Sequence, residues 1–287
     1  APGSRHDRET TATGSSDHLV LLCKNETGYK NLIYMVSEAF LNGFYSKPRI
    51  DMSLLREKHS GLIALSACLG GRIPKHITSG DYEGAEKYAL EMKELFGDDF
   101  YLEVQDHGIP EQKTVNSALY EMSERLNIPL VATNDVHYLK RSDSEAQAIL
   151  MCIQTASCIK DGRPHGFETD EFYYKETWEM ERLFAEHPEA IENTAKIAEK
   201  CNFDFTFGHT CLPDYKCPDG KTPTQYLKEL TETGLISRHK NGELCTEDHP
   251  VEEYRKRMEY ELSVIDKMGY SRYFLIVWDF VNYSRSV

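Results

Sequence analysis

The sequence has no closely spaced CxxC pair of cysteines, no hydrophobic segment at its start, and no apolar run approaching the roughly 20 residues of a membrane helix. Its eight cysteines are scattered along the chain instead. That distribution fits a reducing compartment better than a secreted disulfide framework. We therefore expect a cytoplasmic protein with no membrane contact.

Basic residues are also in short supply. The 33 lysines and arginines are outnumbered by 47 aspartates and glutamates, which leaves a formal net charge of −14. This balance argues against the segment forming a nucleic-acid-binding surface by itself, because such surfaces need clustered positive charge. The 287 residues suffice for one large domain or two modest ones, each with a real core.

What the chain does contain is a regular alternation of short apolar runs and amphipathic stretches. The apolar runs predict strands, and the segments between them have helical spacing, as in Tyr82–Phe96. Strands that alternate with helices imply parallel pairing and βαβ units. The expected fold class is α/β, an incomplete β/α barrel, with strands at His18–Cys23, Leu62–Cys68, Phe100–Val104 and Pro129–Thr133.

The organisation changes near residue 205. Residues 205–221 are rich in Gly and Pro and have no helical period, so they are predicted to be a connector. Thr222, Pro223 and Gln225 then form a capping-box pattern with Pro at the first helical position. A longer helix should open at Pro250 and end at Gly269. We expect two domains, residues 1–205 and a mostly helical region at 206–287.

Both ends of the chain suggest a longer parent protein. The first residue is Ala1 rather than Met, and the apolar segment Phe274–Val281 stops shortly afterwards with nothing following it to pack against. We expect truncation at both ends.

The most informative stretch is residues 129–139, a short apolar run that ends in Asn134, Asp135 and His137. The loops beyond the carboxyl ends of strands hold the chemistry in barrels and doubly wound sheets. An oxygen and an imidazole two residues apart can point toward one metal ion. The alternative is that Asp135 caps the loop and His137 is a partly buried polar residue. A following helix is expected, opened by a capping box at Ser142–Glu145, with apolar Ala146, Ile149, Leu150 and Ile153 on one face.

Two further residues occupy comparable positions. Cys68 ends the second expected strand, and His18 opens the first. Cysteine, histidine and aspartate together suit zinc or a similar borderline metal. Taken singly, a cysteine in this position is more often a small buried apolar side chain, and only the coincidence with other strand ends favours a metal ligand.

Other polar residues could lie near the same mouth. Glu103, Asp106 and His107 lie at the end of the strand expected at Phe100–Val104, and a supporting or solvated role is favoured for them. Lys47 and Arg49 could contact a phosphate, whereas pairing with the acidic excess is the default interpretation.

Several longer motifs occur in a fixed order and carry a family resemblance. They are His18-Leu19, Asn25-Glu26-Thr27-Gly28-Tyr29-Lys30-Asn31-Leu32, Gly43-Phe44-Tyr45 with Lys47-Pro48-Arg49, Leu65–Gly71, Ala132–Tyr138, and Met268-Gly269-Tyr270 with Tyr273–Val277. With these motifs the chain resembles the alpha subunits of bacterial DNA polymerase III, the replicative DNA polymerases, over essentially its whole length.

The resemblance implies that residues 1–205 belong to a polymerase-and-histidinol-phosphatase (PHP) domain, a distorted seven-stranded β/α barrel that lacks its first strands here. Residues 206–287 would be a connector and the start of the polymerase palm. In that family the barrel binds up to three metal ions, and the ligands carried over by position are His18, Cys68, Asp135 and His137. The remaining ligands would precede Ala1. Zinc or manganese is the expected metal.

The resemblance also implies a parent enzyme that performs template-directed DNA synthesis with magnesium in an active site beyond Val287. Its partners would be template-primer DNA, deoxynucleoside triphosphates, the sliding clamp, the clamp loader and proofreading subunits. The barrel itself could perform metal-dependent hydrolysis, such as 3′–5′ exonuclease proofreading, or could serve as a scaffold. A free-standing phosphoesterase of the histidinol-phosphatase type is the alternative, against which the helical extension at residues 222–283 argues.

Overall fold

The computed structural model describes residues 3–6, 16–158, 166–208 and 213–287. The chain divides into two compact units, Ala1–Phe205 and Thr206–Val287. The division falls where the sequence loses its helical period. No helix in the described residues is long and apolar enough to cross a lipid bilayer.

The first unit is built on a four-stranded sheet with the order β1-β2-β3-β4. Its strands are β1 (Val20–Cys23), β2 (Leu62–Leu65), β3 (Phe100–Val104) and β4 (Leu130–Ala132). The last three are parallel, as expected, but β1 runs antiparallel to β2. The expectation of parallel pairing is wrong for β1, because two helices rather than one connect it to β2 and return the chain to the end of the sheet where β1 stopped.

The strand and helix bounds follow the sequence pattern closely in the middle of the sheet. Strand β3 and helix α4 (Tyr82–Phe96) have the predicted limits. Strand β2 is shorter than predicted, because the chain turns at Ser66 and Ala67, and Ala67 has a φ of 66°. His18 precedes β1 and forms a single bridge to Gly71.

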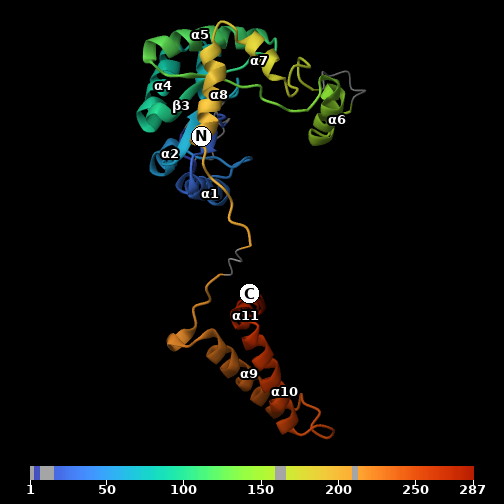
Figure 1. Cartoon of the computed structure of the whole chain (residues 1–287). Coiled ribbons are helices and arrows are strands. Elements are labelled where there is room, and N and C mark those ends of the chain that lie inside the picture. The colour runs from blue at the N-terminus through green and yellow to red at the C-terminus, as the bar shows by residue number, and fades with distance from the viewer. Residues whose placement is uncertain (1–2, 7–15, 159–165, 209–212) are drawn as a thin grey trace. The chain divides into compact units, whose positions relative to one another are not determined.

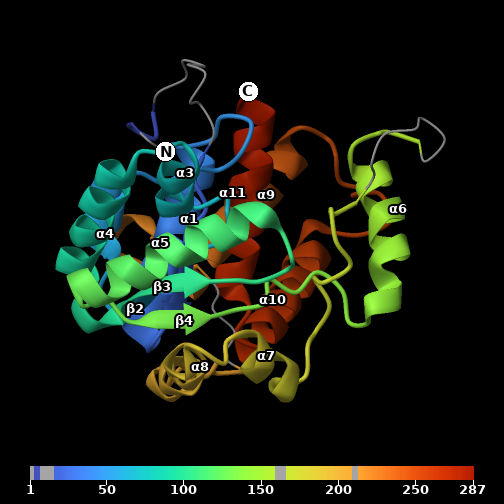
Figure 2. The ribbon, with the colours of Figure 1, turned by 90° about the horizontal axis from the view of Figure 1, so that it is seen from above.

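Helices surround this sheet, and Figures 1 and 2 show α4 and α5 gathered beside it while α8 lies along β4. The remaining helices of the first unit are α1 (Glu26–Leu41), α2 (Met52–Lys58), α3 (Arg72–Thr78), α5 (Pro110–Leu126), α6 (Ser144–Gln154), α7 (Thr177–Leu183) and α8 (Pro188–Lys200). Short 3₁₀ turns occupy Gly97–Asp99 and Arg141–Asp143.

The core forms on both faces of the sheet, because every residue of β2, β3 and β4 is buried. Alternate side chains divide between two clusters, as the strand period of two requires. Leu102 and the strand side chains on the same face of the sheet pack against α3, α4 and α5. On the other face, Tyr101 packs with Val131 and with Ile197 of α8. Glu103 follows Tyr101 by two positions, so it projects from the second face.

Helix α6 departs from expectation in two respects. It begins at Ser144, and the predicted capping box at Ser142–Glu145 does not form, because the Asp143 carboxylate accepts from the Lys140 backbone N–H at 3.0 Å instead. Its apolar residues Ile149, Leu150 and Ile153 are exposed. Helical spacing predicted the helix correctly but not a partner for its apolar face, and Figure 1 shows α6 standing apart from the sheet.

The second unit contains α9 (Pro223–Lys240), α10 (Val251–Lys267) and α11 (Ser271–Ser286), and α9 packs against the other two. The capping box at Thr222 is confirmed: the Thr222 hydroxyl accepts from the Gln225 N–H, and Gln225 accepts from the Thr222 N–H. Gly269, with a φ of 74°, follows the end of α10 as predicted.

Candidate metal centre

Three parallel strands end at one edge of the sheet, and each delivers polar residues there. Ser66–Cys68 follow β2, Gln105–His107 follow β3, and Thr133–His137 follow β4. A cavity of about 690 Å³ opens at this edge. Its polar lining includes His18, Cys68, Glu103, Gln105 and Asp135, and also Lys47 and Arg49.

His18 and Cys68 come together although they are far apart in sequence. The His18 N–H donates to the Gly70 carbonyl at 2.9 Å, and the His18 Nδ1 lies 3.5 Å from the Cys68 Sγ. A Cβ on Gly70 would lie 2.9 Å from the His18 Nδ1, and a Cβ on Gly71 would lie 2.2 Å from the Ser66 carbonyl oxygen. The two glycines therefore let the imidazole and the turn approach the thiol closely.

The Cys68 thiol has an electrostatic environment that disfavours its thiolate. Burial raises the pKa of Cys68, and the nearby carboxylates of Asp135 and Glu103 raise it further, while the Gly70 N–H acts in the opposite direction. A bound cation would reverse this balance, because coordination deprotonates a thiol.

Asp135 and His137 are adjacent but occupy different positions. Asp135, which has a φ of 43°, lines the cavity. His137 is absent from the cavity wall; its Nδ1 lies 2.7 Å from the Asp135 carbonyl oxygen, and its ring lies beside Phe167 and Phe172. Since a carbonyl only accepts, the His137 Nδ1–H is the donor, and in a neutral imidazole the Nε2 is then the nitrogen that carries the lone pair.

The structure thus brings His18, Cys68 and Asp135 to one cavity and holds His137 beside Asp135. Imidazole, thiolate and carboxylate are the donor types that zinc prefers, so the chemistry of the set fits such an ion. Among the described residues, no three or more His, Cys, Asp or Glu side chains are grouped so that they could hold a metal ion. The Gln105 Oε1 is buried and has no hydrogen-bond partner there.

The other three polar residues of this region, Glu103 within β3 and Asp106 and His107 after it, lie in different environments. Glu103 lines the cavity and is 6% exposed. Burial raises the pKa of its carboxyl, while hydrogen bonds from Thr133, Gln105 and Ala67 act in the opposite direction. Asp106 instead lines a second cavity of about 240 Å³.

His107 is fully buried and has a structural role. Its Nε2 donates to the Asn134 carbonyl at 2.8 Å, and its Nδ1 accepts from the Gln112 amide at 2.8 Å. Its ring stacks on Phe172, with centroids 4.0 Å apart. Burial lowers the pKa of His107, which agrees with this neutral hydrogen-bonding pattern.

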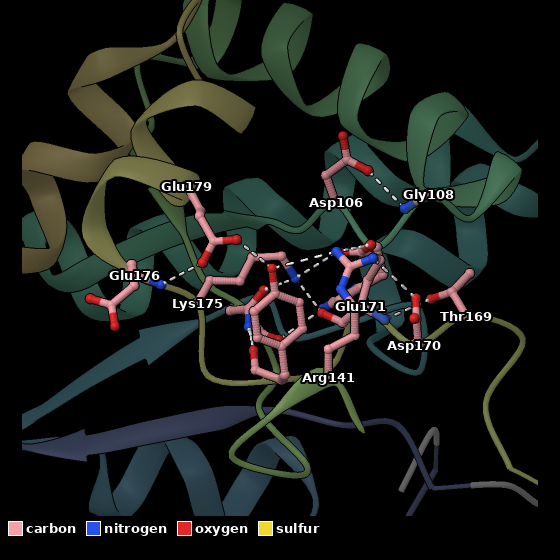
Figure 3. A network of polar contacts seen from close by, with 12 residues as sticks. Asp106, Gly108, Arg141, Thr169, Asp170, Glu171, Lys175, Glu176 and Glu179 are labelled. Carbon is pink, nitrogen blue, oxygen red and sulfur yellow. Dashed lines mark hydrogen bonds and ion pairs between the residues drawn. The ribbon is translucent and has the colours of Figure 1, made fainter. Parts of the chain in front are cut away.

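A second polar network supports the loop that carries Asp135. Figure 3 shows Arg141, Glu171 and Lys175 gathered beside Glu179. Arg141 donates to Glu171 at 2.5 Å, and Lys175, whose side chain is 3% exposed, reaches the Glu171 carboxylate at 3.3 Å and the Asn134 Oδ1 at 3.1 Å. Sequence spacing gave no signal for the Arg141–Glu171 and Lys175–Asn134 contacts, because each joins residues from separate loops.

Known proteins resemble the chain in both units. Residues 4–107 match the PHP domain family, and residues 225–287 match the bacterial DNA polymerase III alpha NTPase domain family. A DNA polymerase III subunit alpha of Borreliella burgdorferi is 47% identical over 272 residues, which cover 94% of this chain and 23% of that protein.

Two other relatives of the same name give a similar picture. The protein of Treponema pallidum is 42% identical across 99% of this chain and 24% of its own length. That of Thermus aquaticus is 38% identical across 99% of this chain and 28% of its own length. The chain therefore spans about a quarter of the length of these relatives.

Proposed function

Because the chain belongs to the family of bacterial DNA polymerase III alpha subunits, we propose that it supplies a metal-binding PHP domain and the start of the polymerase region to a replicative DNA polymerase. The parent activity is template-directed DNA synthesis in chromosome replication. Its substrates are template-primer DNA and deoxynucleoside triphosphates, and its partners are the sliding clamp, the clamp loader and proofreading subunits.

Within this chain, we propose His18, Cys68, Asp135 and His137 as ligands of a divalent ion, zinc or manganese. The observation that carries this proposal is the cavity lined jointly by His18, Cys68 and Asp135, which come from three separate loops. His137 would contribute its Nε2, since its Nδ1 is already engaged.

The cavity suits the hydrolysis of a phosphodiester, as in 3′–5′ proofreading. A divalent ion there would polarise a phosphoryl oxygen and favour deprotonation of bound water. Lys47 and Arg49 line the same cavity and would hold the phosphate by charge. Asp135 and Cys68 would supply the negative charge that retains the cation.

A free-standing phosphoesterase is the second candidate. The match of residues 225–287 to the polymerase family and the far greater length of the relatives favour the polymerase. A barrel that binds metal only as a scaffold differs from both in lacking hydrolysis, so activity measurements separate it.

The test combines zinc binding with hydrolysis. Asp135→Asn should lower the zinc retained by the 287-residue chain in equilibrium dialysis at least tenfold, and should abolish any manganese-dependent cleavage of a single-stranded oligonucleotide. Asp106→Asn is the matched control, because Asp106 also follows a strand but lines the second cavity. Equal zinc retention by the two variants would contradict the ligand assignment. Metal retention without cleavage would support the scaffold.

Polymerisation is tested separately by primer extension with magnesium. The chain alone should give no product, because no carboxylate pair follows a Gly-rich nucleotide loop within it. Template-dependent extension by this chain would contradict the placement of the polymerase site outside it.

A further inference from the structure

We propose that Glu103 is a positioning residue whose single buried carboxylate fixes both the loop that carries Cys68 and the loop that carries Asp135. The functional meaning of this role rests on the metal site proposed above. The structural claim itself depends only on contacts made by this chain.

The location of Glu103 makes such a role feasible. It lies in β3, between β2 and β4, the two strands whose loops carry the candidate ligands. Its side chain is buried, and among the described residues it forms no ion pair with a lysine or arginine. A buried carboxylate without a cation needs several hydrogen-bond donors.

The donors on one side come from the β2 loop. The Glu103 Oε2 accepts from the Ala67 backbone N–H at 3.0 Å, and the Glu103 N–H donates to the Ser66 Oγ at 2.8 Å. Ala67 has a φ of 66°, a left-handed conformation that a residue with a Cβ adopts only when its surroundings hold it there. Cys68 is the next residue, so this turn sets the direction of its thiol.

The donors on the other side are Thr133, which follows β4, and Gln105, which follows β3. The Glu103 Oε1 accepts from the Thr133 hydroxyl at 2.5 Å and from the Gln105 amide at 3.0 Å. The Gln105 amide nitrogen also contacts the Thr133 Oγ1 at 2.9 Å. Asp135 follows shortly after Thr133 and again has a positive φ.

The two oxygens of Glu103 are therefore engaged by three donors from its own neighbours. This occupation argues for a positioning residue rather than a ligand. It also explains the orphaned Gln105 Oε1: the Glu103 carboxylate only accepts, so the Gln105 NH₂ must face it and the amide oxygen must face away.

The test measures both loops in the metal-free chain by amide hydrogen exchange. The Ala67 N–H reports on the β2 loop, and the His137 N–H, which donates to the Phe172 carbonyl at 2.9 Å, reports on the β4 loop. Glu103→Gln should speed exchange at both amides at least tenfold and leave the core amide of Leu119 unchanged. Glu86→Gln, on the surface of α4, should change none of them.

Two further variants separate positioning from general destabilisation. Thr133→Val removes only the hydroxyl and should loosen His137 but not Ala67. Ala67→Gly placed in the Glu103→Gln chain removes the Cβ that opposes the left-handed turn. Because Glu103→Gln loosens the turn before Cys68, it should lower the zinc affinity and the cobalt–thiolate absorption. Ala67→Gly should restore most of both, without restoring protection at His137.

The outcomes decide the two proposals independently. If Glu103→Gln affects Ala67 alone, or if Thr133→Val leaves His137 unchanged, Glu103 does not couple the loops and the inference is overturned. If both loops loosen as expected while the unmodified chain binds neither zinc nor cobalt, the positioning role stands and the proposed metal site fails. Global unfolding of Glu103→Gln leaves Thr133→Val to decide.

Discussion

In the first unit, strands β2, β3 and β4 are buried along their whole length, whereas the described helices of the second unit bury only Leu227, Ser271 and Leu275. The second unit instead exposes aromatic side chains such as Phe280 and Tyr283. A sheet covered on both faces buries the side chains of its strands by itself, whereas three helices that bury few side chains between them do not form a comparable core. The candidate metal centre lies on the better-packed unit, where loop ends are held in fixed conformations.

This difference predicts separate stabilities, and the chain carries a convenient reporter in each unit. Trp178 lies in α7 of the first unit, and Trp278 lies in α11 of the second. In urea, the fluorescence of a Trp278→Phe chain therefore reports on the first unit through Trp178. The fluorescence of a Trp178→Phe chain reports on the second unit through Trp278.

The largest effect should come from emptying the core of the first unit. Leu102 is 0% exposed between the sheet and its helices, whereas Phe280 is 68% exposed. Leu102→Ala should lower the unfolding free energy reported by Trp178 by about 2–5 kcal/mol. Phe280→Ala should change that reported by Trp278 by less than about 0.5 kcal/mol. Comparable losses would mean that Phe280 is packed in solution and that the contrast between units is wrong.

The same glycine substitution should have opposite signs in the two units. A Cβ on Gly28, in the first turn of α1, would lie 1.9 Å from the Gly61 carbonyl oxygen, whereas a Cβ on Gly234 in α9 would meet no atom within 4 Å. Gly28→Ala should destabilise the first unit by about 1–3 kcal/mol. Gly234→Ala should stabilise the second by about 0.5–1 kcal/mol, because alanine favours a helix. Urea midpoints measure both, and a neutral Gly28→Ala would refute the close backbone contact.

A smaller contrast concerns the helix caps. Although burial acts against its charge, hydrogen bonds from Arg5, Leu54 and Ser53 hold the pKa of Asp51, the N-cap of α2, well below its usual range. The stabilisation is complete above the unfolded pKa of about 3.9 and is lost as the pH falls below it. Asp51→Asn should cost about 1–3 kcal/mol at pH 7 and progressively less below about pH 4.

The corresponding cap of the second unit does not titrate. Thr222→Ala should cost α9 about 1 kcal/mol, independently of pH over the same range. Thermal melts at pH 7 and pH 3.5 compare the two caps. A pH-independent loss for Asp51→Asn would show that the Asp51 charge contributes nothing to the first unit.

The sequence predicted the elements of the first unit better than their relations. Strand β3 and helix α4 were predictable because a doubly buried strand is a nearly continuous apolar run, which only Glu103 interrupts in β3, and an amphipathic helix has a clear period. The direction of β1 was not, since strand–helix alternation does not fix the path of a connection. The exposure of Ile149 and Leu150 was not either, because periodicity describes one helix and not its partner.

For the candidate site, too, the sequence predicted the positions of residues better than the contacts between them. Strand-end positions drew attention to His18, Cys68 and Asp135, which the structure brings to one cavity. The contacts of Glu103 were beyond sequence reasoning, since they join it to Ala67 and Thr133, 36 and 30 residues away. A polar residue within an apolar strand pattern indicates that hydrogen-bond partners must satisfy it. The pairing of the strands decides which residues those partners are.

Zinc K-edge X-ray absorption on the zinc-loaded chain tests the central claim most directly, because it identifies the atoms bound to the ion. The account predicts one sulfur at about 2.3 Å with nitrogen and oxygen at about 2.0–2.2 Å. Cys68→Ser should remove the sulfur shell, and Cys245→Ser, at an exposed cysteine of the second unit, should leave it intact. A spectrum without sulfur, or a sulfur shell that persists in Cys68→Ser, would contradict a metal centre at the strand ends of the first unit.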